Sequence, residues 1–146
     1  DGNNMASSLT VGGLKVGMNV AVATPDGYKP DGAVLEFTKG YGDKFALETD
    51  PFMAASGADI LITDTWTSMG EEAEKEERKK IFKDYQINRQ LLAVANAGAM
   101  VQHCLPAYRG QEITEEVFEE HADEIFNEAE NRLHTIKAIM VATLGE

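Results

Sequence analysis

The chain has 146 residues, 43% of them hydrophobic, and a formal net charge of −12. This length suits one domain with a core of its own. The acidic balance argues against nucleic acid as a partner, because phosphate binding needs a basic face, and no apolar run approaches the roughly 18 residues of a membrane helix. One cysteine cannot form an internal disulfide, so a reducing, cytoplasmic compartment is expected.

Short apolar runs alternate along the chain with longer amphipathic or charged segments. The runs expected to form strands are 18–23, 44–49, 59–65 and 99–104. The segments expected to form helices are 4–11, 30–39, 51–57, 69–85, 88–95, 115–120 and 131–144. This alternation predicts an α/β fold with a Rossmann-like, open and mainly parallel sheet and helices on both faces, in three αβα layers.

Local signals mark several of the helix boundaries. No cap is evident at residues 1–4, and the two glycines at 12–13 are expected to stop the first helix. Ser68 and Glu71 form a capping box, Ser-x-x-Glu, at the start of a long charged helix. These signals predict where the chain turns between its elements.

Two segments at predicted strand ends carry residues suited to chemistry. Ligands of open α/β sheets bind where strands end and helices begin, so 64–70 and 103–106 should face one crevice. A lone cysteine such as Cys104 is commonly just a small buried hydrophobe. His103 is not expected to act as its base, because adjacent strand residues point to opposite faces.

The segment after the third predicted strand combines a carboxylate with a helix start. The structural role of Ser68 is that of an N-cap, and free backbone N–H groups at Met69 and Gly70 could hold an anion. Asp64 could face an ammonium group, although an Asp at a strand end is often only a loop or capping residue. No cluster of ligand residues has metal-binding spacing, so no metal is predicted. The lack of a Gly-x-Gly-x-x-Gly or Walker loop disfavours nucleotide binding.

The acidic excess is concentrated in two stretches. The runs in 71–77 and 112–130 are interpreted as solvated helix faces that favour solubility. His121 and His134 are expected at the surface, and Arg132, between acidic neighbours, could be an ordinary surface arginine. On residue patterns alone, these positions carry no functional assignment.

Four motifs together give the chain a family resemblance. They are Asp1-Gly2-Asn3-Asn4, Asp64-Thr65-Trp66-Thr67-Ser68-Met69-Gly70, His103-Cys104-Leu105-Pro106 and Glu128-Ala129-Glu130-Asn131-Arg132. Over essentially its whole length, the chain resembles the C-terminal half of an ornithine carbamoyltransferase. The resemblance implies a transferase, without a cofactor, that moves the carbamoyl group of carbamoyl phosphate to the δ-amine of L-ornithine. The products would be L-citrulline and phosphate, in arginine biosynthesis or degradation.

The resemblance also implies roles for individual residues. Cys104 would be the catalytic residue, lying against the δ-amine as a base or as an orienting group. The residues implied to hold ornithine are Asn4, Asp64, Ser68 and Met69. Those implied to contact carbamoyl phosphate are Cys104, Leu105 and Arg132, with His103 and Pro106 in support.

Only half of the family's protein is represented. Residues 1–146 are expected to be the C-terminal ornithine-binding domain, without the carbamoyl-phosphate-binding domain and without the first strand of the sheet. Such a chain should be inactive alone and should lose the homotrimer that the N-terminal half builds. It would be part of a longer polypeptide or be completed by a separate segment. An apolar face on the last helix should be exposed; its residues are Leu133, Ile136, Ile139, Met140 and Leu144.

Two other functions compete with this interpretation. One is a carbamoyltransferase for another amine such as putrescine, which residues 68–70 (Ser-Met-Gly) argue against because they separate ornithine-using family members from their relatives. The other is a non-catalytic domain that binds an amino acid. Ornithine binding without citrulline formation would distinguish this second alternative from the enzyme.

Overall fold

The computed structural model describes residues 1–67 and 72–145. The strands are β1 (Val20–Ala23), β2 (Phe45–Glu48), β3 (Ile60–Thr63) and β4 (Met100–His103). The α-helices are α1 (Asn4–Lys15), α2 (Gly32–Thr38), α3 (Pro51–Ala55), α4 (Lys75–Phe82), α5 (Arg89–Leu92), α6 (Glu115–Glu120) and α7 (Ala122–Leu144). Short 3-10 turns cover Lys39–Lys44, Glu72–Glu74 and Lys83–Tyr85. Over these described ranges, no helix is both long and apolar enough to cross a membrane.

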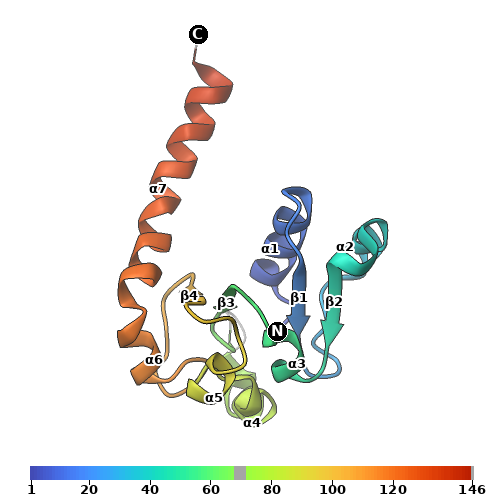
Figure 1. Cartoon of the computed structure of the whole chain (residues 1–146), viewed down its shortest axis with the longest axis vertical. Coiled ribbons are helices and arrows are strands. Elements are labelled where there is room, and N and C mark those ends of the chain that lie inside the picture. The colour runs from blue at the N-terminus through green and yellow to red at the C-terminus, as the bar shows by residue number, and fades with distance from the viewer. Residues whose placement is uncertain (68–71, 146) are drawn as a thin grey trace.

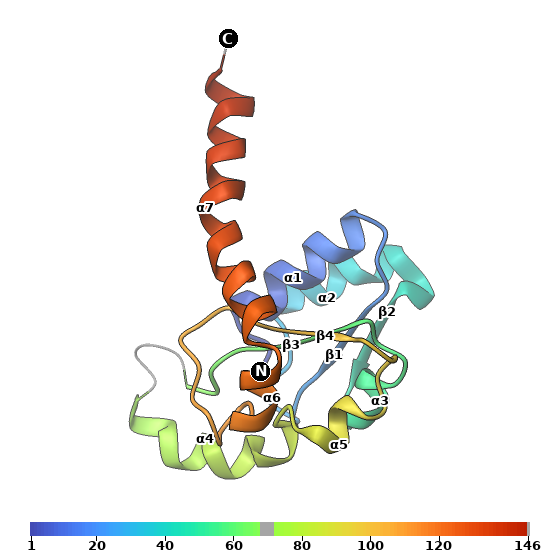
Figure 2. The same ribbon diagram turned by 60° about the vertical axis from the view of Figure 1, so that its left-hand side comes forward.

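The strands form parallel pairs, as the alternation of elements predicts. β1 pairs with β2, with Val20 opposite Phe45, and β3 pairs with β4, with Ile60 opposite Met100. In both views α1 and α2 lie on one side of the strands, and α4 and α5 lie on the other (Figures 1 and 2). The α/β prediction is therefore confirmed. The described residues arrange the sheet as two separate two-stranded parts rather than one continuous sheet.

The first helix begins at Asn4, as predicted from the sequence, but it has a cap that was not expected and it ends later. Asn3 is its N-cap, since its side-chain oxygen accepts the N–H groups of Met5 and Ala6 at 3.0 and 3.1 Å. The helix also continues through Gly12 and Gly13. A Cβ at Gly13 would lie 3.0 Å from the Val20 side chain, so the glycine allows β1 to pack closely against α1.

The true end of α1 comes at another glycine. Gly17 adopts a φ of 90°, which is the left-handed conformation that commonly terminates helices. The sequence-based interpretation therefore assigned the stop signal to the wrong glycines. Helix-internal glycines cost about 1 kcal/mol relative to alanine, and the packing against β1 explains why one is present here.

The C-terminal helix is longer than predicted. α7 begins at Ala122, directly after α6, and not near residue 131. Its first turns pack into the core through Ile125, which is fully buried, together with Val101, Ile113 and Val117. Its remainder projects away from the body (Figures 1 and 2). The first turns of α7 pack on β4, which explains why the helix begins at Ala122. The many acidic residues of this segment led to its interpretation as a solvated surface.

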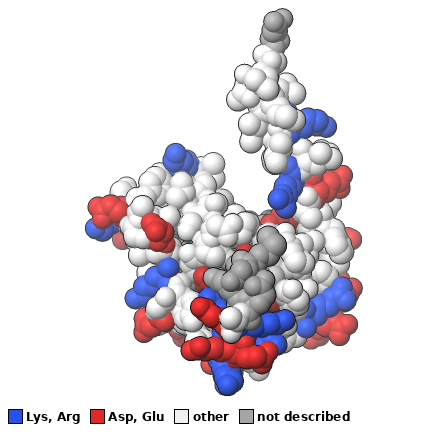
Figure 3. All heavy atoms as spheres, turned by 180° about the vertical axis from the view of Figure 1, so that it is seen from behind, with Lys and Arg blue, Asp and Glu red and all other residues white. Residues whose placement is uncertain are grey.

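The projecting part of α7 has the exposed apolar face expected from the sequence. Leu133 is 67% exposed and Ile139 is 60% exposed. Figure 3 shows this part of the helix as mostly uncharged, whereas charges of both signs cover the body. An apolar face of this extent marks a surface that other protein structure normally covers.

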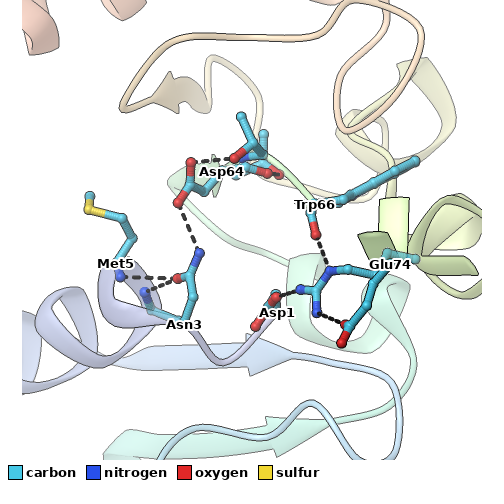
Figure 4. Close-up of polar contacts among 10 residues, drawn as sticks. Asp1, Asn3, Met5, Asp64, Trp66 and Glu74 are labelled. Carbon is cyan, nitrogen blue, oxygen red and sulfur yellow. Dashed lines mark hydrogen bonds and ion pairs between the residues drawn. The ribbon is translucent and has the colours of Figure 1, made fainter. Parts of the chain in front are cut away.

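A buried cation fixes the region between the chain start and α4. Arg78 is 4% exposed; it pairs with the carboxylate of Asp1 and donates its Nε–H to the carbonyl of Trp66 (Figure 4). Its guanidinium also lies 5.0 Å from the ring centroid of Tyr28 and 5.2 Å from that of Phe82. Burial lowers the pKa of Arg78 below its usual value.

Replacement of this arginine should destabilise the fold strongly. Arg78→Met leaves the Asp1 carboxylate and the Trp66 carbonyl without their cation, and loss of one partner of a buried pair costs about 3–5 kcal/mol. Urea unfolding followed by circular dichroism measures this loss. Lys80→Met, an exposed change on the same helix, is the matched control and should leave the free energy of unfolding nearly unchanged. Equal stability of the two variants would contradict the prediction.

Candidate functional site

The carboxyl ends of β3 and β4 bring Asp64 and Cys104 together. Asp64 directly follows β3, and Cys104 directly follows β4. The Cys104 thiol donates to Asp64 Oδ1 at a distance of 3.0 Å. The two segments singled out in the sequence therefore meet at the edge of the sheet where ligands of such folds bind.

The Asp64 carboxylate is held from several directions (Figure 4). Its Oδ1 accepts the N–H of Thr65 at 2.7 Å, and its Oδ2 accepts the side-chain amide of Asn3 at 2.9 Å. Asn3 is also the cap of α1, so one side chain ties the start of this helix to the end of β3. An acceptor fixed in this way is preorganised for a cationic or N–H-bearing ligand.

The two asparagines of the opening motif have different positions. Asn4, implied by the resemblance to hold ornithine, is exposed on the first turn of α1. Asn3, which carried no assignment, makes the contact with Asp64. The preference of asparagine for the N-cap position was the signal that could have predicted this role, although no cap was expected at residues 1–4.

A buried pair fixes the backbone beyond Cys104. The His103 side chain is fully buried, and its Nδ1 accepts the N–H of Leu105 at 2.9 Å. The other nitrogen, Nε2, therefore carries the proton and donates to Glu112 Oε1 at 3.0 Å. Leu105 has a φ of 55°, an unfavourable conformation for a side chain of this kind. Pro106 follows it at the surface.

Glu112 is a residue that sequence reasoning missed. It was assigned to a solvated acidic run, but it is fully buried and also accepts the N–H of Tyr108. The available signal was its place as the one acidic residue between Pro106 and Thr114, outside the helix that follows. The prediction that His103 is not the base for Cys104 agrees with this geometry, because both ring nitrogens have other partners.

The other two histidines differ in their exposure. His134 is half exposed beside Glu130, as expected. His121 was expected at the surface, but its side chain is only 12% exposed, with Nδ1 2.9 Å from Glu124 Oε2. His121 lies at the junction of α6 and α7 and is partly buried, so it is less exposed than the sequence predicted.

Cys104 is held as a thiol. Burial is the main cause that raises its pKa to about 12, and the hydrogen bond and negative charge of Asp64 and the charge of Glu128 raise it further. At neutral pH the group is therefore a hydrogen-bond donor rather than a thiolate. This state favours an orienting role over that of a base.

The remaining candidate site residues have no described contact with Asp64 or Cys104. Ser68 and Met69 lie outside the described residues, as does their capping box with Glu71. Arg132 is exposed on α7, one helical turn after Glu128. The described contacts do not connect it to Cys104.

The side chains of Asp64, His103 and Cys104 include ligand atoms within 4.8 Å of one another. Sequence spacing did not reveal this group, because Asp64 comes from a distant strand. However, both ring nitrogens of His103 have partners and the thiol is protonated. Metal ligands must be deprotonated and available, so this arrangement favours the hydrogen-bond network over metal ligation.

The raised pKa of Cys104 predicts slow alkylation. Between about pH 7 and pH 9, iodoacetamide should label the folded chain far more slowly than a cysteine peptide, because the thiolate is the reactive form. Asp64→Asn removes the main negative charge beside the thiol and should accelerate labelling, as followed by mass spectrometry. Asp59→Asn, at the opposite end of β3, is the control. Labelling of the wild-type chain at the peptide's rate would refute the assignment.

Loss of Glu112 should weaken the fold around the site. Glu112→Ala leaves the His103 Nε2–H and the Tyr108 N–H without an acceptor, at about 1–3 kcal/mol for each buried group. Chemical denaturation measures the change, and the exposed Glu115→Ala provides the comparison. Similar unfolding curves for the two variants would show that the pair does not support the site.

Comparisons with known proteins identify the family of the chain. Residues 1–143 match the family model described as "Aspartate/ornithine carbamoyltransferase, Asp/Orn binding domain". The chain is 54% identical to the ornithine carbamoyltransferase of Gloeobacter violaceus and 50% identical to that of Carboxydothermus hydrogenoformans. In each case 99% of this chain but only 48% of the relative is covered, so the chain spans about half the length of these relatives.

Solved structures give the same result. The anabolic ornithine carbamoyltransferase of Campylobacter jejuni is similar with a TM-score of 0.90 and 44% identity, over 96% of this chain and 48% of that protein. The ornithine carbamoyltransferase of Pyrococcus furiosus is similar with a TM-score of 0.85 and 45% identity. The match covers 97% of this chain and 46% of that protein. The chain thus belongs to the aspartate/ornithine carbamoyltransferase family, in which it matches the Asp/Orn-binding domain.

Proposed function

We propose that residues 1–146 form the C-terminal, ornithine-binding domain of an ornithine carbamoyltransferase. The observation that carries this proposal is the hydrogen bond from Cys104 to Asp64 where β3 and β4 end. It places an N–H-accepting carboxylate and a small donor side by side in a chain whose similar relatives bear that enzyme's name. The reaction converts L-ornithine and carbamoyl phosphate to L-citrulline and phosphate.

The amino-acid end of ornithine is assigned to the Asp64 side of the site. Asp64 accepts the α-ammonium group, for which Asn3 and Thr65 already orient its oxygens. Asn4, Ser68 and the Met69 backbone complete the contacts to the α-amino and α-carboxylate groups. Substrate bound at both groups extends its side chain toward Cys104, which lies 3.0 Å from Asp64.

The reaction forms a C–N bond and breaks a C–O bond. The neutral δ-amine attacks the carbonyl carbon of carbamoyl phosphate, phosphate leaves with the electron pair of the C–O bond, and it takes the proton that the amine loses. Cys104 stays a thiol, consistent with its pKa of about 12, and orients the amine as a hydrogen-bonding neighbour. Leu105 and Arg132 contact carbamoyl phosphate. Orientation and electrostatics then supply most of the rate.

The complete enzyme requires a carbamoyl-phosphate-binding half. The half-length match to relatives, the two separate sheet parts and the exposed face of α7 support this requirement. In this proposal the intact protein is a cytoplasmic homotrimer that uses no cofactor, and this domain alone does not turn over. The net charge of −12 fits small-molecule substrates better than nucleic acid.

The test uses the complete transferase, with this chain joined to a carbamoyl-phosphate-binding half. Wild type should form citrulline from ornithine and should not carbamoylate putrescine. Cys104→Ala should lower kcat by at least about tenfold, because a misplaced amine loses the benefit of orientation, and should impair turnover more than folding. Ser8→Ala, on the exposed face of α1, is the control.

Each other outcome changes the assignment. An unchanged kcat for Cys104→Ala would remove the role of this residue. Putrescine turnover would favour the transferase for another amine, and ornithine binding without citrulline would favour a non-catalytic binding domain. Calorimetric titration of ornithine into the same sample distinguishes the last two outcomes.

A further inference from the structure

The outer edge of β4 needs hydrogen-bond acceptors. The Met100 N–H donates to the Asp59 carbonyl at 2.9 Å, on the side of β3. Successive peptide groups of a parallel strand point to alternate sides, so the N–H groups of Val101 and His103 face away from β3. In the part of the chain that the structure describes, β4 pairs with β3 alone. Unpaired edge N–H groups beside a packed helix are costly.

Carboxyl groups of α7 supply these acceptors. The Val101 N–H donates to Glu124 Oε2 at 2.9 Å. One helical turn later, the carboxyl of Glu128 lies near the backbone N–H of His103, which acts to lower its pKa. Two side chains of a helix therefore take the place of a neighbouring strand.

The spacing of these contacts fits helix and strand geometry. Four helical residues rise about 6 Å and two strand residues rise about 6.6 Å, so each turn of α7 advances in step with two residues of β4. Both segments run in the same direction, since 101 and 103 meet 124 and 128. Extended by one more step, the same register would bring Arg132 to the level of Leu105.

We propose that Glu124 and Glu128 are positioning residues that set the register of α7 on β4 and thereby place Arg132 at the Cys104–Leu105 segment. The inference rests on the proposed function, in which Arg132 and Leu105 contact carbamoyl phosphate. Arg132 lies on a part of α7 that is exposed and has little other support. Its position relative to the site therefore depends on the two contacts below it.

The surroundings of the two carboxyl groups support this role. Glu124 is fixed a second time by His121, whose Nδ1 lies 2.9 Å away. Glu128 keeps one oxygen, Oε2, buried without a partner among the described residues. Burial raises the pKa of Glu128, and the His103 N–H opposes this shift. The burial of the Glu128 carboxyl is unfavourable by itself, so we attribute it to the packing of α7 along β4.

The test compares substrate constants in the complete transferase. Glu124→Leu and Glu128→Leu should each raise KM for carbamoyl phosphate about tenfold, the equivalent of one lost charge-assisted hydrogen bond, and leave KM for ornithine within about twofold. Glu128→Gln, which keeps an acceptor oxygen, should rescue most of the loss. Glu130→Leu, the same change on the opposite, exposed face of α7, should have no effect.

Amide hydrogen exchange of this chain gives an independent readout. Glu128→Leu should accelerate exchange at His103, and Glu124→Leu should accelerate it at Val101. If a leucine variant does not fold, Glu128→Asp replaces it in the kinetic and exchange measurements. This variant keeps the charge on a shorter side chain, and it should weaken carbamoyl phosphate binding.

The outcomes separate the two proposals. An unchanged KM for carbamoyl phosphate, unchanged exchange, or a glutamine variant as impaired as leucine would overturn the register proposal. A wild-type enzyme that forms no citrulline would instead overturn the proposed function, while faster exchange at His103 and Val101 would still support the helix–strand contact.

Discussion

The carboxylate of Asp64 connects parts of the fold that no shared sheet connects. Through Asn3 it reaches the start of α1, and through Cys104 it reaches the end of β4. Because β1–β2 and β3–β4 are separate pairs in the described residues, these contacts, together with the pair between Arg78 and Asp1, hold the two parts in relation. The candidate site is therefore also a structural joint.

A second layer of buried polar groups stabilises this joint. His103 and Glu112 are fully buried, and between them they bind the N–H groups of Leu105 and Tyr108. Buried polar groups carry a desolvation cost that hydrogen bonds offset; here Glu112 Oε1 has partners, whereas its Oε2 has none among the described residues. The hydrogen bond from the Leu105 N–H to His103 supports a left-handed conformation that the Leu105 side chain disfavours.

Patterns within the sequence predicted the parallel α/β fold, the strands and the cap of α6 at Thr114, because these depend on local chemistry. The continuation of α1 through Gly13 depends on Val20, and the burial of Glu112 depends on His103. These features depend on residues elsewhere in the chain, and the periodicity of the sequence contains no information about such contacts. The family motifs identified Asp64 and Cys104, but the hydrogen bonds between these two residues and from Asn3 to Asp64 became visible only in the folded structure.

The high pKa of Cys104 also bears on the durability of the chain. Oxidants attack the thiolate, and a thiol with a pKa of about 12 is almost entirely protonated at pH 7. The one cysteine of the chain is thus chemically quiet as well as half-buried. Peroxide stress or handling without a reductant should leave the site intact, and the environment that holds the thiol in place is the same one that preserves it.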